Sequence, residues 1–405
     1  MITRLWPAIG IACVILQGCA SLERLPAVPA DRTTQAVVPG IPNARYWVDS
    51  DLGPYVKDAL KSVEREMAAL AAAGGSRDSL PPTHFLAISG GGDDGAFGAG
   101  LLNGWTATGT RPVFKIVTGV STGALTAPFA YLGSRYDEVL RNVYTSVSSK
   151  DIFEARGMMA VITSDAMSDN SPLWTLLSKY VTPDLMKEIA AEYGKGRLLL
   201  IATANLDARR PVVWNMGEIA SSPDPRALDL FRRIMIASAS IPGAFPPMMI
   251  DVEVDGKRYQ EMHVDGGTMA QVFLYPPRLA ETARAAGYKV PERERHVYVI
   301  RNTRIDPNWA SVDRKTVSIV GRAITSLIQT QGIGDLYRIY LTAQQDKLDF
   351  NLAFIGSEFN VEHKEEFDTV YMRALYDYGY QLARKGYPWM KAPPGLKASD
   401  QPIFK

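Results

Sequence analysis

The sequence predicts an α/β fold, and three observations carry this prediction. Short apolar runs typical of buried strands alternate with segments of helical period along most of the 405 residues. Two glycine-rich turns, residues 89–95 and 119–123, each follow such a run and precede a helical pattern. The composition is 46% hydrophobic, which is enough for a large core.

The amino terminus resembles that of a secreted lipoprotein. Arg4 precedes an apolar run over 5–16, which is too short to span a bilayer, and Leu16-Gln17-Gly18-Cys19 resembles a bacterial lipobox. We expect cleavage before Cys19 and acylation of its thiol; an ordinary secretory signal that is cut elsewhere is the alternative. In a Gram-negative host, Ala20 after the cysteine favours the outer membrane of the cell envelope. Four prolines in residues 20–43 then predict an extended tether.

The remaining elements follow from periodicity. Apolar residues at helical spacing predict an amphipathic helix over 54–73, and 319–344 reads as a longer helix in which Gly332 and Gly334 mark breaks. The aromatic-rich segment 371–389 is predicted to be helical and either to pack on the body or to shape an entrance. Apolar runs predict strands over 85–88, 113–117, 197–204, 211–215 and 296–301.

Charge argues against one class of partner. The 44 lysines and arginines nearly balance 43 acidic residues, and no basic cluster stands out, so we expect no nucleic-acid partner.

The turn Gly119-Val120-Ser121-Thr122-Gly123 has the pattern of a nucleophile elbow. It places Ser121 between a strand and a helix, and Gly119 and Gly123 leave room for a tight, strained turn. The pattern therefore favours acyl-ester hydrolysis with Ser121 as nucleophile.

The upstream turn Gly90-Gly91-Gly92-Asp93-Asp94-Gly95 formally satisfies a dinucleotide fingerprint. However, the next strand ends in the elbow rather than in an acid for a ribose, and two aspartates would face a pyrophosphate. No Lys-Ser/Thr pair follows, which excludes a P-loop. Backbone N–H groups at a helix start suit an oxyanion hole instead, with Gly91 and Gly92 as donors and Gly90 and Gly95 shaping the turn.

A serine nucleophile needs a base, and the chain has four histidines: His84, His263, His296 and His363. A serine, acid, histidine order would require His296 or His363, and neither has a motif around it. Asp265, in Asp265-Gly266-Gly267, lies at a predicted strand end. In a desolvated cleft a carboxylate with a raised pKa can take the serine proton directly.

Together these segments resemble the patatin-like phospholipases. The glycine turn, the elbow and Asp265-Gly266-Gly267 match the family's motifs, and residues 237–247 look like its Ala-Ser-x-x-x-Pro-x-x-Phe segment. The resemblance covers roughly residues 85–300. It implies a three-layer α/β/α fold with a mainly parallel sheet, a Ser121–Asp265 dyad, an oxyanion hole of Gly90, Gly91 and Gly92, and calcium-independent hydrolysis of lipid acyl esters without a cofactor or metal.

The expected organisation is a lipoprotein signal peptide over 1–18, a tether over 19–50, an amphipathic helix within 51–80, the hydrolase domain over 83–356 and a C-terminal helical extension over 357–405. One residue departs from the family, because Asp94 stands where a cation is usual; it either disfavours anionic head groups or caps the following helix. An acyltransferase and a catalytically weak envelope scaffold are the alternative functions.

Overall fold

The computed structural model describes residues 24–75, 80–155, 165–277, 279–307 and 309–396. The predicted signal peptide and Cys19 lie outside these ranges. The described helices are α1 (Gly53–Ala72), α2 (Gly95–Ala107), α3 (Thr122–Leu132), α4 (Asp137–Thr145), α5 (Ser149–Ile152), α7 (Ser171–Tyr180), α8 (Pro183–Gly194), α9 (Met216–Ser221), α10 (Ala227–Ala239), α11 (Leu279–Ala285), α12 (Thr316–Gln345) and α13 (Thr369–Arg384), with 3₁₀ turns η1 (Ala30–Gln35), η2 (Gly92–Asp94), η3 (Ser134–Tyr136) and η4 (Gly266–Thr268).

The strands form one large mixed sheet with the order β1-β7-β6-β3-β2-β10-β11. The five neighbouring strands β6, β3, β2, β10 and β11 are parallel. Strands β7 and β9 each pair antiparallel with β6, and β8 pairs antiparallel with β9. The strands are β1 (Arg45–Tyr46), β2 (Thr83–Ile88), β3 (Ile116–Gly119), β6 (Leu198–Asn205), β7 (Arg210–Asn215), β8 (Met248–Val254), β9 (Lys257–Asp265), β10 (Arg295–Arg304) and β11 (Asp349–Ile355), with a small separate pair of β4 (Glu154–Ala155) and β5 (Ser168–Asp169).

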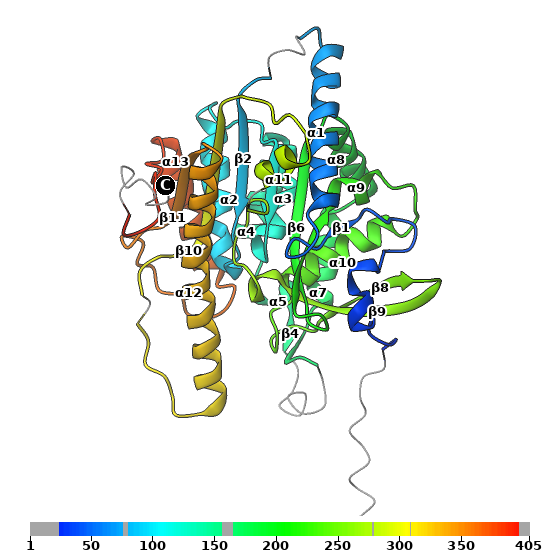
Figure 1. Cartoon of the computed structure of the whole chain (residues 1–405). Coiled ribbons are helices and arrows are strands. Elements are labelled where there is room, and N and C mark those ends of the chain that lie inside the picture. The colour runs from blue at the N-terminus through cyan, green and yellow to red at the C-terminus, as the bar shows by residue number, and fades with distance from the viewer. Residues whose placement is uncertain (1–23, 76–79, 156–164, 278, 308, 397–405) are drawn as a thin grey trace, which may run out of the picture.

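Helices cover both faces of this sheet, which makes three layers (Figure 1). Side chains alternate across a strand, so Leu86 and Ile88 of β2 join a core with α2, α3, α10 and α13, whereas Phe85 and Ala87 join a second core with α1 and α12. The predicted α/β/α class with a mainly parallel sheet is confirmed. Parallel strands place their carboxyl ends at one edge, and the glycine turn after β2 and the elbow after β3 lie there together.

One expectation about the amino-terminal segment is wrong. Residues 24–50 do not form an extended tether, because Val28, Val38 and Ile41 are buried in the core and β1 pairs with β7. Arg45 forms a buried ion pair with Glu261. This segment forms a 3₁₀ helix and isolated β-bridges. Such structures bury apolar residues without a regular spacing, so the sequence pattern did not predict that this segment is buried.

The aromatic-rich C-terminal segment is helical and packs on the body, which is one of the two arrangements expected for residues 371–389. Helix α13 packs on α2 so closely that a Cβ on Gly100 would lie 2.0 Å from the carbonyl oxygen of Tyr376. The predicted breaks in the long helix are also absent, since α12 continues through Gly332 and Gly334. Gly332 is required for another reason: a Cβ there would lie 2.5 Å from Nη1 of Arg301.

Candidate active site

Ser121 lies at the sharp turn between β3 and α3. Its φ of 55° and ψ of −127° are strained for a residue with a side chain, and its side chain is almost wholly buried. The turn is possible because the flanking glycines allow close packing: a Cβ on Gly119 would lie 2.4 Å from the carbonyl oxygen of Gly123, and one on Gly123 would lie 2.3 Å from that of Ile88. The predicted elbow geometry is therefore present.

Asp265 ends β9 and faces Ser121. Strand β9 pairs with β6, which is next to β3, and this register brings the carboxyl to the elbow. Its side chain accepts a hydrogen bond of 2.7 Å from the N–H of Gly267. Burial raises the pKa of Asp265 to about 7, although hydrogen bonds from the Ser121 hydroxyl and the Gly267 N–H act to lower it. The carboxyl can thus exchange a proton near neutral pH.

Close packing also explains the two glycines after Asp265. A Cβ on Gly266 would lie 2.4 Å from the carbonyl oxygen of Ala202, and one on Gly267 would lie 2.3 Å from Nε2 of Gln271. The turn therefore fixes Asp265 tightly against β6.

The end of α10 holds the backbone of both Ser121 and Asp265 in place. The hydroxyl of Ser238 accepts a hydrogen bond of 3.0 Å from the N–H of Ser121 and donates one of 2.7 Å to the carbonyl of Ala202. Two residues on, the carbonyl of Ser240 accepts a hydrogen bond of 2.9 Å from the N–H of Asp265. The sequence analysis identified residues 237–247 as a family-like segment but did not predict these hydrogen bonds, because the bonded residues lie far apart in the chain.

The glycine turn after β2 provides two candidate oxyanion donors. Gly91 and Gly92 have φ of 153° and 58°, which favour glycine, and among the described residues no acceptor is found for their N–H groups. The N–H of Gly90, by contrast, already donates to the carbonyl of Gln271 over 3.0 Å. Gly90 is therefore removed from the predicted set of donors, and Gly91 and Gly92 remain.

Gly95 begins α2 beside the elbow, where a Cβ would lie 2.3 Å from Oγ1 of Thr122. The glycine turn is fastened to β10 by Asn302, which is fully buried. Its N–H donates to the Ser89 hydroxyl over 2.8 Å and its side-chain amide to the Ser89 carbonyl over 3.0 Å. Neither Ser238 nor Asn302 was predicted as a positioning residue.

The two aspartates of the glycine turn contact the C-terminal segment. Asp93 accepts hydrogen bonds of 2.7 Å from Nε2 of His363 and 2.8 Å from the N–H of Phe367, and Asp94 accepts one of 2.6 Å from the Tyr371 hydroxyl. Burial raises the pKa of Asp94 to about 7. Asp94 precedes α2, but its side chain does not cap the helix, so the capping alternative is wrong.

The four histidines have other surroundings. His263 bonds Thr203 and Glu261, while His363 bonds Asp93. His84 stacks on His296 at the amino ends of β2 and β10, the edge opposite to the elbow. The geometry therefore pairs Ser121 with a carboxylate rather than with an imidazole.

Two cavities flank the glycine turn. One is apolar, about 50 Å³, and is bordered by Gly92 and Thr122 next to the nucleophile. The other is polar, about 660 Å³, and is bordered by Ser89, Asp94 and Gln271. A Cβ on Gly90 would lie 2.8 Å from Oε1 of Gln271 and 3.1 Å from Cβ of Ser121, so Gln271, which borders the second cavity, lies near Ser121.

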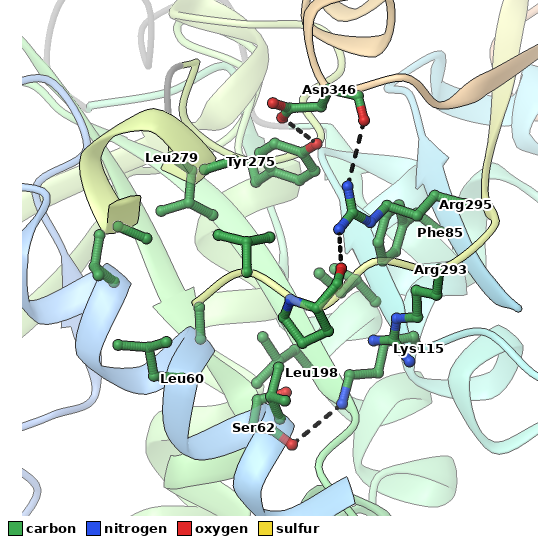
Figure 2. A pocket seen from close by; sticks show the side chains of 18 of the residues that line it. Leu60, Ser62, Phe85, Lys115, Leu198, Tyr275, Leu279, Arg293, Arg295 and Asp346 are labelled. Atoms are coloured by element: carbon green, nitrogen blue, oxygen red, sulfur yellow. Dashed lines mark hydrogen bonds between the residues drawn. The ribbon is translucent and has the colours of Figure 1, made fainter. Parts of the chain in front are cut away.

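A third cavity, of about 140 Å³, lies at the opposite edge of the sheet, between α1, α11 and the amino ends of β2, β3 and β6 (Figure 2). Three of its four cations are bonded to other groups: Lys115 and Arg293 both contact Glu66, and Arg295 donates to backbone carbonyls. Neither Ser121 nor Asp265 is among the residues that line it. No group of three or more metal-ligating side chains occurs among the described residues.

The family model of patatin-like phospholipase matches residues 86–276. No curated protein sequence gives a significant match. Among solved structures, the chain is similar to VipD from Legionella pneumophila, with 11% identity, a TM-score of 0.38, and coverage of 76% of this chain and 68% of that one. It is also similar to human GIVD cytosolic phospholipase A2, with 11% identity, a TM-score of 0.39, and coverage of 81% and 63%.

The matched range contains the glycine turn, the elbow and the Asp265 turn. Residues 86–276 therefore form a patatin-like phospholipase domain.

Proposed function

We propose that the protein is a serine acyl hydrolase that cleaves lipid esters through Ser121 and Asp265. Oγ of Ser121 attacks the ester carbonyl while the Asp265 carboxylate takes its proton, and the N–H groups of Gly91 and Gly92 bind the oxyanion. The ester C–O bond then breaks, and Asp265 returns the proton to the leaving alcohol. Water attacks the acyl-enzyme and gives a proton to Asp265. The bond between the acyl carbon and Oγ of Ser121 then breaks, Asp265 returns the proton to Oγ, and the fatty acid is released, which restores both residues.

The observation that carries this proposal is the meeting of a strained, buried serine with a buried carboxyl whose pKa is about 7. At neutral pH such a carboxyl is partly ionised, so it can accept the serine proton and return it. The two unpaired N–H groups of the glycine turn supply the third part of the mechanism.

The apolar cavity beside Gly92 and Thr122 suits the acyl chain. Leu125, Leu176 and Leu177 are among its lining residues, so the chain would leave water as the ester reaches Ser121. Its volume of about 50 Å³ favours short acyl chains.

We also propose attachment to a membrane, in the cell envelope, through a lipid on Cys19. Arg24 is fixed to the body by a 2.7 Å ion pair with Asp207, which follows β6 at the edge that carries Ser121. Five residue steps separate Cys19 from Arg24, a reach of at most about 18 Å. A lipid on Cys19 would therefore hold this edge close to the bilayer. No helix among the described residues is long and apolar enough to span a membrane.

The experiment is fatty-acid release from a short-chain triacylglycerol by the wild type, Ser121→Ala and His296→Gln. We expect Ser121→Ala to lose activity and His296→Gln, whose ring lies at the opposite edge, to keep it. Equal activity in Ser121→Ala would refute the proposal. Adding an acceptor alcohol separates a hydrolase from an acyltransferase, because a transferase would form a new ester instead of free fatty acid.

A further inference from the structure

The glycine turn is anchored on two sides, with Gly92 between the two anchors. On one side Gly91 packs on β10, where a Cβ would lie 2.1 Å from the carbonyl oxygen of Asn302. On the other side the side chains of Asp93 and Asp94 contact the C-terminal segment. Apart from its chain neighbours, no atom of the described residues lies within 4 Å of where a Cβ on Gly92 would be. The direction of the Gly92 N–H therefore depends on the two anchors.

Asp93 is a buried carboxylate that is bonded to the C-terminal segment. Its side chain is 7% exposed. Its Oδ2 atom accepts a hydrogen bond of 2.7 Å from Nε2 of His363 and one of 2.8 Å from the N–H of Phe367. No other donor to this carboxylate is found in the part of the chain that the structure describes. A buried carboxylate is stable only when it is paired, so these two bonds fix the glycine turn to residues 363–367.

His363 is held in the orientation that this bond needs. Its ring packs on that of Tyr371, with the two ring centroids 4.4 Å apart. The hydroxyl of Tyr371 in turn donates to Asp94 over 2.6 Å. Burial acts to lower the pKa of His363, but the charge of Asp93 and the hydrogen bond with it raise that pKa above its usual value. The bond between His363 and Asp93 therefore stays charge-assisted to a higher pH than an isolated histidine would allow.

Phe367 connects this contact with the apolar cavity. Its φ of 59° is unfavourable for a residue with a side chain. In this conformation its N–H donates to Asp93, and the residue also lines the apolar cavity that is bordered by Gly92 and Thr122. A strained backbone persists only where the surrounding contacts hold it, and such residues cluster at functional sites. The segment thus contributes both to the anchor of the glycine turn and to the cavity wall beside Ser121.

We propose that residues 363–371 form a clamp that sets the position of the oxyanion-hole N–H groups, with His363 as its main positioning residue. The proposal rests on the proposed acyl hydrolase function. His363 acts through Asp93, which follows Gly92 in the chain. The clamp lies outside residues 86–276, so the matched domain alone lacks part of the support of its oxyanion hole.

The expected effect is on the transition state rather than on substrate binding. The oxyanion forms only when Ser121 attacks the ester, so a displaced glycine turn lowers kcat and leaves KM nearly unchanged. Loss of one oxyanion donor lowers kcat about 10²- to 10³-fold. A donor that is misplaced instead of lost should cost less, about 10- to 100-fold.

The test compares the wild type, His363→Ala and His363→Gln on p-nitrophenyl butanoate, a soluble ester. His363→Ala should lower kcat about 10- to 100-fold and change KM by less than about threefold. His363→Gln should stay within about threefold of the wild type, because the glutamine amide can donate to Asp93 in place of Nε2. His296→Ala is the matched control and should keep the wild-type kcat. His296 also bonds an aspartate, Asp349, over 3.0 Å, but at the edge of the sheet opposite to the elbow.

A trifluoromethyl ketone separates positioning of the oxyanion hole from a general loss of folding. Oγ of Ser121 adds to its carbonyl carbon, the Oγ proton goes to Asp265, and the carbonyl oxygen becomes an oxyanion. In His363→Ala the inhibition constant should rise by the same factor as kcat/KM falls, whereas in His363→Gln and His296→Ala it should stay within about threefold of the wild type. All activities are referred to the fraction of molecules that a fluorophosphonate labels at completion, so misfolded molecules do not count.

The proposal is overturned by a wild-type kcat in a folded His363→Ala, by a lowered kcat with an unchanged inhibition constant, or by equal losses in His363→Ala and His363→Gln. If His363→Ala does not fold, Tyr371→Phe takes its place, because it removes the bond to Asp94 and keeps the ring, and its kcat and inhibition constant decide in the same way. A wild type that neither cleaves the ester nor reacts at Ser121 would instead refute the acyl hydrolase function.

Discussion

Replacing Asp265 with asparagine should stabilise the protein at alkaline pH and lower its activity. Burial raises the pKa of the Asp265 carboxyl from 3.8 to about 7, a difference of about three units. At 1.36 kcal/mol per unit, ionising this group in the folded protein costs about 4 kcal/mol. The asparagine side chain has nearly the same shape and stays neutral, so it avoids this cost.

The pH dependence has a definite sign. Below about pH 4 the carboxyl is protonated in both states. Between about pH 4 and 7 the unfolded chain releases the proton while the folded protein keeps it, so the wild-type free energy of unfolding falls as pH rises. Above about pH 7 both states are ionised and the loss is complete. We therefore expect denaturant unfolding, measured from pH 4 to 9, to show that the free energy of unfolding of Asp265→Asn exceeds that of the wild type by an amount that grows between about pH 4 and 7 and reaches about 4 kcal/mol.

The wild-type activity should rise with pH over the range in which the wild-type free energy of unfolding falls. A base must be ionised, so wild-type kcat/KM should rise through about pH 7, and Asp265→Asn should lower it about 10²- to 10⁴-fold. Asp94→Asn is the matched control, because burial also raises the pKa of Asp94 to about 7 but its partner is Tyr371. That variant should also gain stability at alkaline pH, but its kcat/KM should still rise through about pH 7. If the limb disappears in Asp94→Asn instead, or if Asp265→Asn follows the wild-type stability at every pH, the reasoning is refuted.

Three further changes test other parts of the account. Ser238→Ala removes the hydroxyl that bonds the Ser121 N–H and the Ala202 carbonyl, so it should cost about 1–3 kcal/mol of unfolding free energy for each of these groups and should lower kcat. Ser240→Ala is the control and should cost about 1 kcal/mol, because the Ser240 hydroxyl bonds only its own helix. Equal losses of unfolding free energy in the two variants would contradict this. Leu176→Ala enlarges the apolar cavity and should raise kcat/KM for octanoyl relative to butanoyl esters; an unchanged ratio would remove the acyl-chain assignment. Cys19→Ala should shift the protein from the membrane to the soluble fraction of its host, and unaltered fractionation would reject the lipid anchor.

The sheet and the elbow could be predicted because their signals are local. Apolar runs marked β2, β6, β7 and β10, and the spacing of Gly119 and Gly123 marked the turn at Ser121. The strand predicted over 113–117 starts instead at Ile116, since Val113 is exposed.

The support of the site could not be predicted, because it depends on contacts between distant segments. Ser238 lies 117 residues from Ser121, and Asn302 lies 213 residues from Ser89. Gly332 resembled a helix break, yet its lack of a side chain makes room for Arg301. A local sequence pattern predicts the type of turn, but it does not predict which distant residue a buried hydroxyl or guanidinium contacts.

The nucleophile assignment is tested most directly by labelling with a fluorophosphonate, followed by intact mass and peptide mapping. The account predicts one adduct per wild-type molecule, on Ser121, none in Ser121→Ala, and labelling at least about 100-fold slower in Asp265→Asn because the proton acceptor is gone. An adduct on another serine, or wild-type labelling rates in Asp265→Asn, would contradict the Ser121–Asp265 dyad.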